Sequence, residues 1–71
     1  MNLNKEINQI NNHFSSREFK KVVSSCEKII QSKIENTIIY NLYGLGLQKM
    51  GSFDKSIRAF ENSIQLQKNN F

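Results

Sequence analysis

The sequence predicts an all-α fold in which two antiparallel helix hairpins stack on each other. The 71 residues include no Pro and three Gly, so few positions interrupt a helix. Apolar residues recur at steps of three and four, the spacing of one helix face. The chain also repeats itself: residues 34 positions apart are identical in the pairs Phe19 and Phe53, Lys21 and Lys55, Glu27 and Glu61, Ile30 and Ile64, Gln31 and Gln65, and Asn36 and Asn70. This period is typical of stacked helical repeats, which act by presenting a surface.

The first half predicts two helices. Asn2 or Asn4 can cap a helix that ends near residues 13–16. Ser15 followed by Glu18 is a capping-box pattern, so a second helix should begin there and run to about Ser32. The residues expected to face inward are Leu3, Ile7, Ile10 and Phe14 on the first helix, and Phe19, Val22, Val23, Cys26, Ile29, Ile30 and Ile34 on the second.

The second half predicts two more helices. Asn36 or Thr37 can cap a third helix that is apolar nearly all round, which favours burial on two sides, and Gly51 can end it. Its apolar residues are Ile38, Ile39, Leu42, Tyr43, Leu45, Leu47 and Met50. Ser52 can cap a fourth helix, and residues 68–71 should form a turn. The residues expected to face inward on the fourth helix are Phe53, Ile57, Phe60, Ile64 and Leu66.

Residues 40–70 carry a spaced set of aromatic, apolar and small residues: Tyr40, Tyr43, Gly44, Leu47, Gly51, Phe53, Ser56, Phe60, Ser63 and Leu66. The set resembles the tetratricopeptide repeat. The resemblance implies a short right-handed superhelix of two repeats, about residues 3–35 and 36–70. Gly44, Ser56 and Ser63 should let the helices of the second repeat approach closely.

The first repeat matches this pattern less well. Its helix aligns with the third at a spacing of 33, so the turn at residues 15–17 should be one residue shorter than the turn at residues 50–52. Asn11, Val22 and Ile29 stand where small residues are expected. A looser crossing of the first two helices follows, as in a degenerate end repeat.

The resemblance also implies a binding site, because in this family the first helix of each repeat lines a concave groove for a peptide or protein segment. Helical spacing places on that side Lys5, Asn8, Asn12, Asn41, Leu45, Gln48 and Lys49. Asn side chains offer both a donor and an acceptor to an extended backbone. The alternative is that these residues are merely solvated. A carboxylate clamp is not expected, since Asn8 stands where the family has Lys.

Two other functions remain open besides this interaction module. A nucleic-acid-associated helical module would use Arg17, Lys20, Lys21, Lys28 and Lys33, but these residues do not fall on one clear stripe and the aromatic residues are needed for packing. The formal net charge of +4 is spread from Lys5 to Lys68. Because two repeats are few for such an array, the chain is expected either to belong to a longer array, which we favour, or to self-associate through its uncapped C-terminal face.

No catalytic or metal site is expected. Cys26, the only cysteine, lies among apolar residues and should be a small buried hydrophobe. His13, the only histidine, has no partner at metal-ligand spacing and is expected to be an exposed residue at a helix end. The interpretation is therefore a non-enzyme without a cofactor. Residues 1–12 lack the apolar run of a secretory signal or a membrane span, so a cytoplasmic location is expected.

Overall fold

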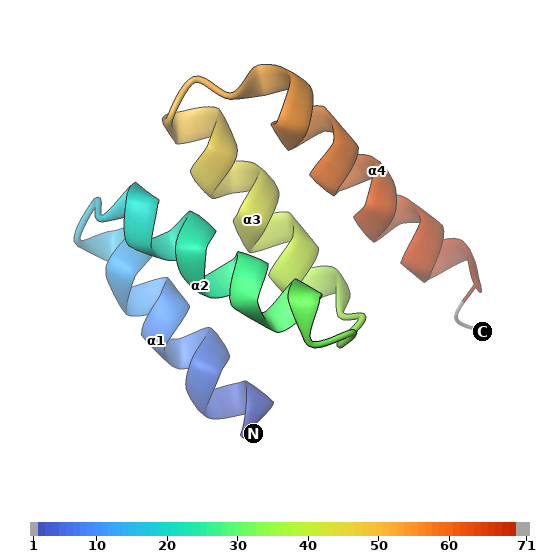
Figure 1. The fold of residues 1–71 in the computed structure, drawn as a ribbon, viewed down its shortest axis with the longest axis horizontal. Coiled ribbons are helices and arrows are strands. Elements are labelled where there is room, and N and C mark those ends of the chain that lie inside the picture. Colours follow the sequence, from blue (N-terminus) through green and yellow to red (C-terminus); the bar gives the residue numbers. More distant parts are fainter. Residues whose placement is uncertain (1, 70–71) are drawn as a thin grey trace.

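The structure, a computed structural model, describes residues 2–69, which form four helices and no strand: α1 (Leu3–Ser15), α2 (Phe19–Gln31), α3 (Thr37–Lys49) and α4 (Phe53–Asn69). The all-α prediction is confirmed. In Figure 1, α1 and α2 run antiparallel to each other, as do α3 and α4. The helix α3 contacts the other three helices. It is therefore the central element of the molecule.

The predicted caps explain where α1 and α3 begin. The Oδ1 atom of Asn2 accepts a hydrogen bond from the backbone N of Lys5 (3.2 Å). The Oδ1 atom of Asn36 accepts from the backbone N of Ile38 (2.8 Å) and of Ile39 (3.2 Å). These bonds satisfy backbone donors that a helix start otherwise leaves unpaired. After α3, Gly51 has a φ of +82°, the left-handed conformation predicted for it.

The capping box predicted for the second helix is wrong. Ser15 is the last residue of α1, and α2 begins only at Phe19. Glu18 precedes α2 but its side chain caps no backbone group, because it binds other side chains. The first turn of α2 therefore has no side-chain cap, and its start depends on tertiary contacts.

The predicted difference in turn length is also wrong. Residues 16–18 and 50–52 form connections of equal length between their helices. Arg17, with a φ of 59°, occupies the place that Gly51 holds in the second connection. The offset of 33 residues therefore relates the packed faces of α1 and α3. The offset of 34 residues relates the ends of the helices in the two hairpins.

The core lies mainly between α1, α2 and α3. One cluster of buried residues joins these three helices, namely Ile10, Val22, Cys26, Ile29, Ile39 and Leu42. A smaller cluster of Val23, Leu47 and Ala59 brings in α4. Cys26 is completely buried, as predicted. Because the first cluster draws on α3, the first hairpin depends on the second for its core.

The crossing of α3 and α4 is built from small residues, as predicted. The Oγ atom of Ser56 donates to the carbonyl of Gly44 (2.8 Å), and the Oγ atom of Ser63 donates to the carbonyl of Thr37 (3.3 Å). The ring of Phe60 lies over Gly44, where a Cβ atom would come within 2.7 Å of it. This hairpin has more extensive contacts than the hairpin of α1 and α2, which agrees with the looser first crossing expected from the sequence.

The predicted inward face of α4 is wrong for three of its residues. Phe53, Ile57 and Ile64 are 62%, 57% and 50% exposed. The contact with α3 is made instead by Ser56, Ala59 and Ser63, which are buried, while Phe60 and Leu66 are half-buried. Small residues take the contact because they allow the closer helix approach.

The end of α4 also differs from prediction. The helix continues through Asn69, so residues 68 and 69 are helical and not part of a turn. No Pro stands near this point to stop the helix. The predicted turn at residues 70 and 71, and the end of the second predicted repeat, lie outside the described residues.

Candidate partner-binding surface

The outward side of α3 carries a stripe of mixed chemistry, in which Ile38, Leu45 and Gln48 are exposed and Asn41 is half-buried. Asn41, Leu45 and Gln48 recur at steps of four and three, so they share one helix face. Ile38 precedes Asn41 by three residues and extends the stripe. Leu45 is 37% exposed and Ile38 is 49% exposed. The stripe therefore alternates apolar side chains with amides.

The sequence places Ile38 only among the apolar residues of this helix, and its exposure was not predicted. The signal that could have found it is its spacing of seven residues from Leu45, which had been assigned to the outer face. The helix is buried on the sides that meet its neighbours, as predicted, but the exposure of Ile38, Leu45 and Met50 shows that its apolar residues also reach the surface.

The α1 part of the predicted groove is a second exposed stripe. Lys5, Asn8 and Asn12 follow one another at steps of three and four, and all three are exposed. The helices α1 and α3 contact each other and run in the same direction (Figure 1). The sequence-predicted residues thus lie on two neighbouring parallel helices.

Two contacts fix α3 on α2 and so position the α3 stripe. The Oη atom of Tyr43 donates to Oε2 of Glu27 (3.0 Å), and burial, followed by Glu27, raises the pKa of Tyr43 to about 12. At Gly46 the backbone of α3 lies so close to α2 that a Cβ atom would be 3.0 Å from the side chains of Val22 and Val23. A helix held in this way presents its outer residues in a defined orientation.

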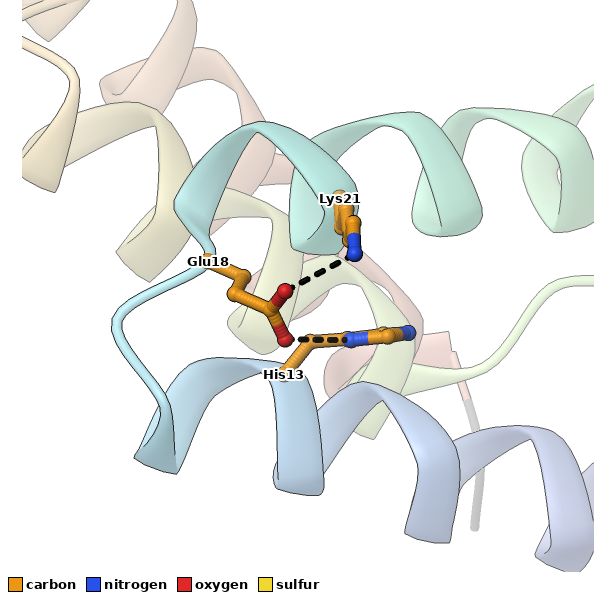
Figure 2. A network of polar contacts seen from close by, with 3 residues as sticks. All are labelled: His13, Glu18 and Lys21. Atoms are coloured by element: carbon orange, nitrogen blue, oxygen red, sulfur yellow. Dashed lines mark hydrogen bonds and ion pairs between the residues drawn. The ribbon is translucent and has the colours of Figure 1, made fainter.

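His13, Glu18 and Lys21 form a polar network that joins the end of α1 to the start of α2 (Figure 2). The Nδ1 atom of His13 lies 3.1 Å from Oε1 of Glu18, and Nζ of Lys21 donates to Oε2 of Glu18 (2.8 Å). Lys21 and then His13 lower the pKa of Glu18. His13 is at a helix end, as predicted, but its side chain is only partly exposed.

A cleft beside this network gathers basic side chains. Arg17, Lys20, Lys21 and Lys28 line an open hollow of about 710 Å³. Their spacing along the sequence predicts no single stripe, but the structure brings these four residues together in one cleft and leaves out only Lys33. The other residues that line the cleft are His13, Glu18, Phe19, Ser24, Ser25 and Met50. Residues of the connection and of two helices meet here, which spacing along one helix could not reveal.

Neither a thiol of lowered pKa nor a cluster of metal ligands is found among the described residues. Burial, followed by the charge of Glu27, raises the pKa of Cys26 to about 12, so its thiol is protonated at neutral pH. Among residues 2–69 no three His, Cys, Asp or Glu side chains are grouped to hold a metal ion. Within the same residues no helix has the length and apolarity to cross a membrane.

No protein-family model, curated protein or solved structure matches this chain. The tetratricopeptide resemblance accordingly stays a prediction from the spacing of residues 40–70.

Proposed function

We propose that this chain is a protein–protein interaction module of the tetratricopeptide type. In this proposal its two hairpins form a short right-handed superhelix, part of a longer array, that binds an extended segment of another protein along α1 and α3. The observation that carries the proposal is the α3 stripe of Ile38, Asn41, Leu45 and Gln48, which is exposed except at the half-buried Asn41, beside the exposed amides of α1.

The chemistry of these stripes fits an extended peptide. The amides of Asn8, Asn12 and Asn41 can each donate to and accept from a peptide backbone. Ile38 and Leu45 are large apolar side chains in water, and covering them removes apolar surface at about 25 cal/mol per Å². An extended partner segment would have free backbone N–H and carbonyl groups to bond these amides. Apolar residues in the same segment would cover Ile38 and Leu45.

Selection from a displayed random-peptide library, with the folded chain as bait, tests this proposal. Peptides that are enriched would be titrated against Asn41→Ala and Leu45→Ala variants. Each substitution should weaken binding by about fivefold to tenfold, because each removes one contact worth roughly 1 kcal/mol. The melting temperature should change little, because neither side chain belongs to a buried cluster.

Arg58→Ala is the matched control, since Arg58 is exposed on α4 and outside the proposed surface. It should leave peptide affinity unchanged. If Arg58→Ala abolished binding while Asn41→Ala had no effect, the assignment of the binding face would be wrong. Failure to enrich any peptide would count against the module itself.

A second candidate function, self-association, rests on a separate observation. Phe53, Ile57 and Ile64 form an exposed apolar stripe along α4. At the matching positions of α2, Val23 and Ile30 pack within the core. The outer face of α1 is polar, with Asn4, Lys5 and Asn8. Two copies would therefore pair α4 with α4 rather than stack end to end, in a two-fold symmetric contact.

Light scattering on the chain at micromolar concentration tests self-association. A dimer mass that reverts to a monomer mass in an Ile57→Lys variant would support pairing through α4. A monomer mass for the unmodified chain across that concentration range would exclude it, and would leave the peptide-binding proposal standing.

A further inference from the structure

The positive charge of this protein is concentrated on one region of its surface. The cleft lined by Arg17, Lys20, Lys21 and Lys28 adjoins a smaller one of about 380 Å³, which shares Arg17 and Phe19 with it and adds Lys49. These two hollows hold five of the ten basic residues and, in Glu18, one of the six acidic residues. The five basic and five acidic residues elsewhere cancel, so the whole formal net charge of +4 lies here.

The single carboxylate of the region does not neutralise it. Glu18 is bound on one side by Lys21 and on the other by His13 (Figure 2). Arg17, Lys20 and Lys28 are exposed and lie outside this network. In the larger cleft three cations therefore remain for an anionic ligand, together with the hydroxyl groups of Ser24 and Ser25, which line the same cleft.

The cleft also has an apolar part. Phe19 and Met50 line it, and Phe19 packs edge-on against Phe14 with ring centroids 5.3 Å apart. Met50 is exposed at the end of α3. A volume of about 710 Å³ lies in the range of sites that enclose a small ligand or a short peptide segment.

We infer that this region is a second binding site, specific for an acidic protein segment that carries an apolar or aromatic side chain. Its carboxylates pair with Arg17, Lys20 and Lys28, and its apolar side chain covers Phe19 and Met50. This site goes beyond the proposed peptide groove, with which it shares only Lys49.

The spacing of the cations favours an extended chain over a single small anion. Lys20 and Lys28 are eight residues apart on α2, which is about 12 Å along a helix axis. Cations spread over that distance can each pair with a separate carboxylate of one peptide. A peptide in extended conformation advances about 3.3 Å per residue and spans that distance with three or four residues.

The same features favour a peptide over a nucleic acid. Stacking of bases requires exposed aromatic faces. Phe19, the aromatic residue lining the cleft, is half-buried and already packed against Phe14. Lys33, the fifth basic residue that a nucleic-acid surface would use, does not line the cleft.

Fluorescence anisotropy with a labelled synthetic peptide tests the inference. The probe has a central Phe flanked by Asp and Glu, and the comparison peptide has Asn and Gln in their place. The acidic peptide should bind and the neutral one should not, and its affinity should fall as salt is raised. An acidic peptide with Ala in place of the Phe should bind several-fold more weakly, because the apolar contact is lost.

Two glycine substitutions make a matched pair of variants. Arg17 and Lys33 both have positive φ values, 59° and 66°, so Gly relieves backbone strain at either position and neither variant should unfold the protein. Both remove one positive charge. Arg17→Gly should weaken binding of the acidic peptide by about twofold to fivefold, and Lys33→Gly should leave its affinity unchanged. The double variant with Arg17→Gly and Lys28→Gln should weaken binding of the acidic peptide by about tenfold.

Three results would overturn the inference. One is the absence of binding by the acidic peptide at low salt. Another is equal weakening by Arg17→Gly and Lys33→Gly, which would mean diffuse attraction between net charges. The third is tighter binding of a single-stranded or duplex oligonucleotide, with a steep salt dependence, which would reassign the cleft to nucleic acid. Neither glycine variant touches the α1 and α3 stripes, so the peptide-groove proposal stands or fails separately.

Discussion

Gly44 shows how a single residue sets the distance between two helices. Its missing side chain leaves room for the ring of Phe60, and its carbonyl accepts the hydroxyl of Ser56. The sequence predicted this role correctly, because a glycine inside a helix is unfavourable unless packing requires it. The structure identifies Phe60 as the residue that fills this space.

We predict that Gly44→Ala destabilises the protein by about 1 kcal/mol. Alanine favours the helix by nearly 1 kcal/mol, but its Cβ atom would lie 2.7 Å from the Phe60 ring, and overpacking costs about 1–3 kcal/mol. In a Phe60→Val background, which removes the clashing ring atoms, Gly44→Ala should become neutral or stabilising. Urea unfolding of the four proteins measures this coupling. A cost of the same size in both backgrounds would contradict the proposed contact.

Cys26 and Tyr43 should make the free energy of unfolding depend on pH in the alkaline range. Burial raises the pKa of Cys26 from an ordinary 9.0 to about 12, and that of Tyr43 from 10.0 to about 12. Below pH 9 both groups keep their protons whether the chain is folded or unfolded, so stability is complete. As the pH rises further, the unfolded chain releases its protons first, and the free energy of unfolding falls.

Unfolding by urea at pH 8, 9 and 10 checks this dependence. Stability should decline over this range, and the decline should be smaller in a Cys26→Ala variant, although that variant is less stable at every pH because it has a cavity. A Cys26→Ala protein with the same pH slope as the unmodified chain would exclude the thiol as the cause.

At the scale of the element, α2 and α4 have similar sequences but different surroundings. Val23 and Ile57 occupy matching positions in the repeat. Val23 is 9% exposed, because α3 covers that face of α2, whereas nothing described covers Ile57. Periodicity marked both as inward-facing. It failed for α4 because a helix pattern shows which residues share a face and not whether another helix covers it.

We predict opposite outcomes for lysine at these two positions. Val23→Lys should cost at least about 2 kcal/mol, because it places a charge in a buried cluster. Ile57→Lys should change stability by no more than about 0.5 kcal/mol, as is usual at an exposed site. Thermal melts followed by circular dichroism compare them. An equally large loss with Ile57→Lys would mean that the α4 stripe is covered in solution.

At the scale of the whole molecule, the two hairpins share one core. Ile39 and Leu42 of α3 complete the cluster built by Ile10 of α1 and three residues of α2. The sequence marked all of these positions as apolar and could not say that they meet. A chain of this length is marginally stable in any case, so the shared cluster decides whether it folds.

We predict that residues 1–35 alone do not fold. Without α3 the fragment exposes the side of its core that Ile39 and Leu42 cover, and an isolated helical hairpin has too little buried surface to offset its lost conformational entropy. Its circular dichroism spectrum should show little helix, while the full chain should be helical and unfold cooperatively. A stable, cooperatively melting fragment would show that the first hairpin is independent.

The sequence by itself determined the four helices, a cap at Asn2 or Asn4 and another at Asn36 or Thr37, the turn at Gly51, and the small residues at the crossing of α3 and α4, because each depends on neighbours within a few positions. Only the tertiary structure decided that Asn2 and Asn36 are the caps, that Glu18 binds His13 and Lys21, that the α4 stripe is exposed, and that five cations, Arg17 among them, line two adjoining hollows. Those features depend on how separate helices are placed against one another, and burial and charge clustering are properties of that placement.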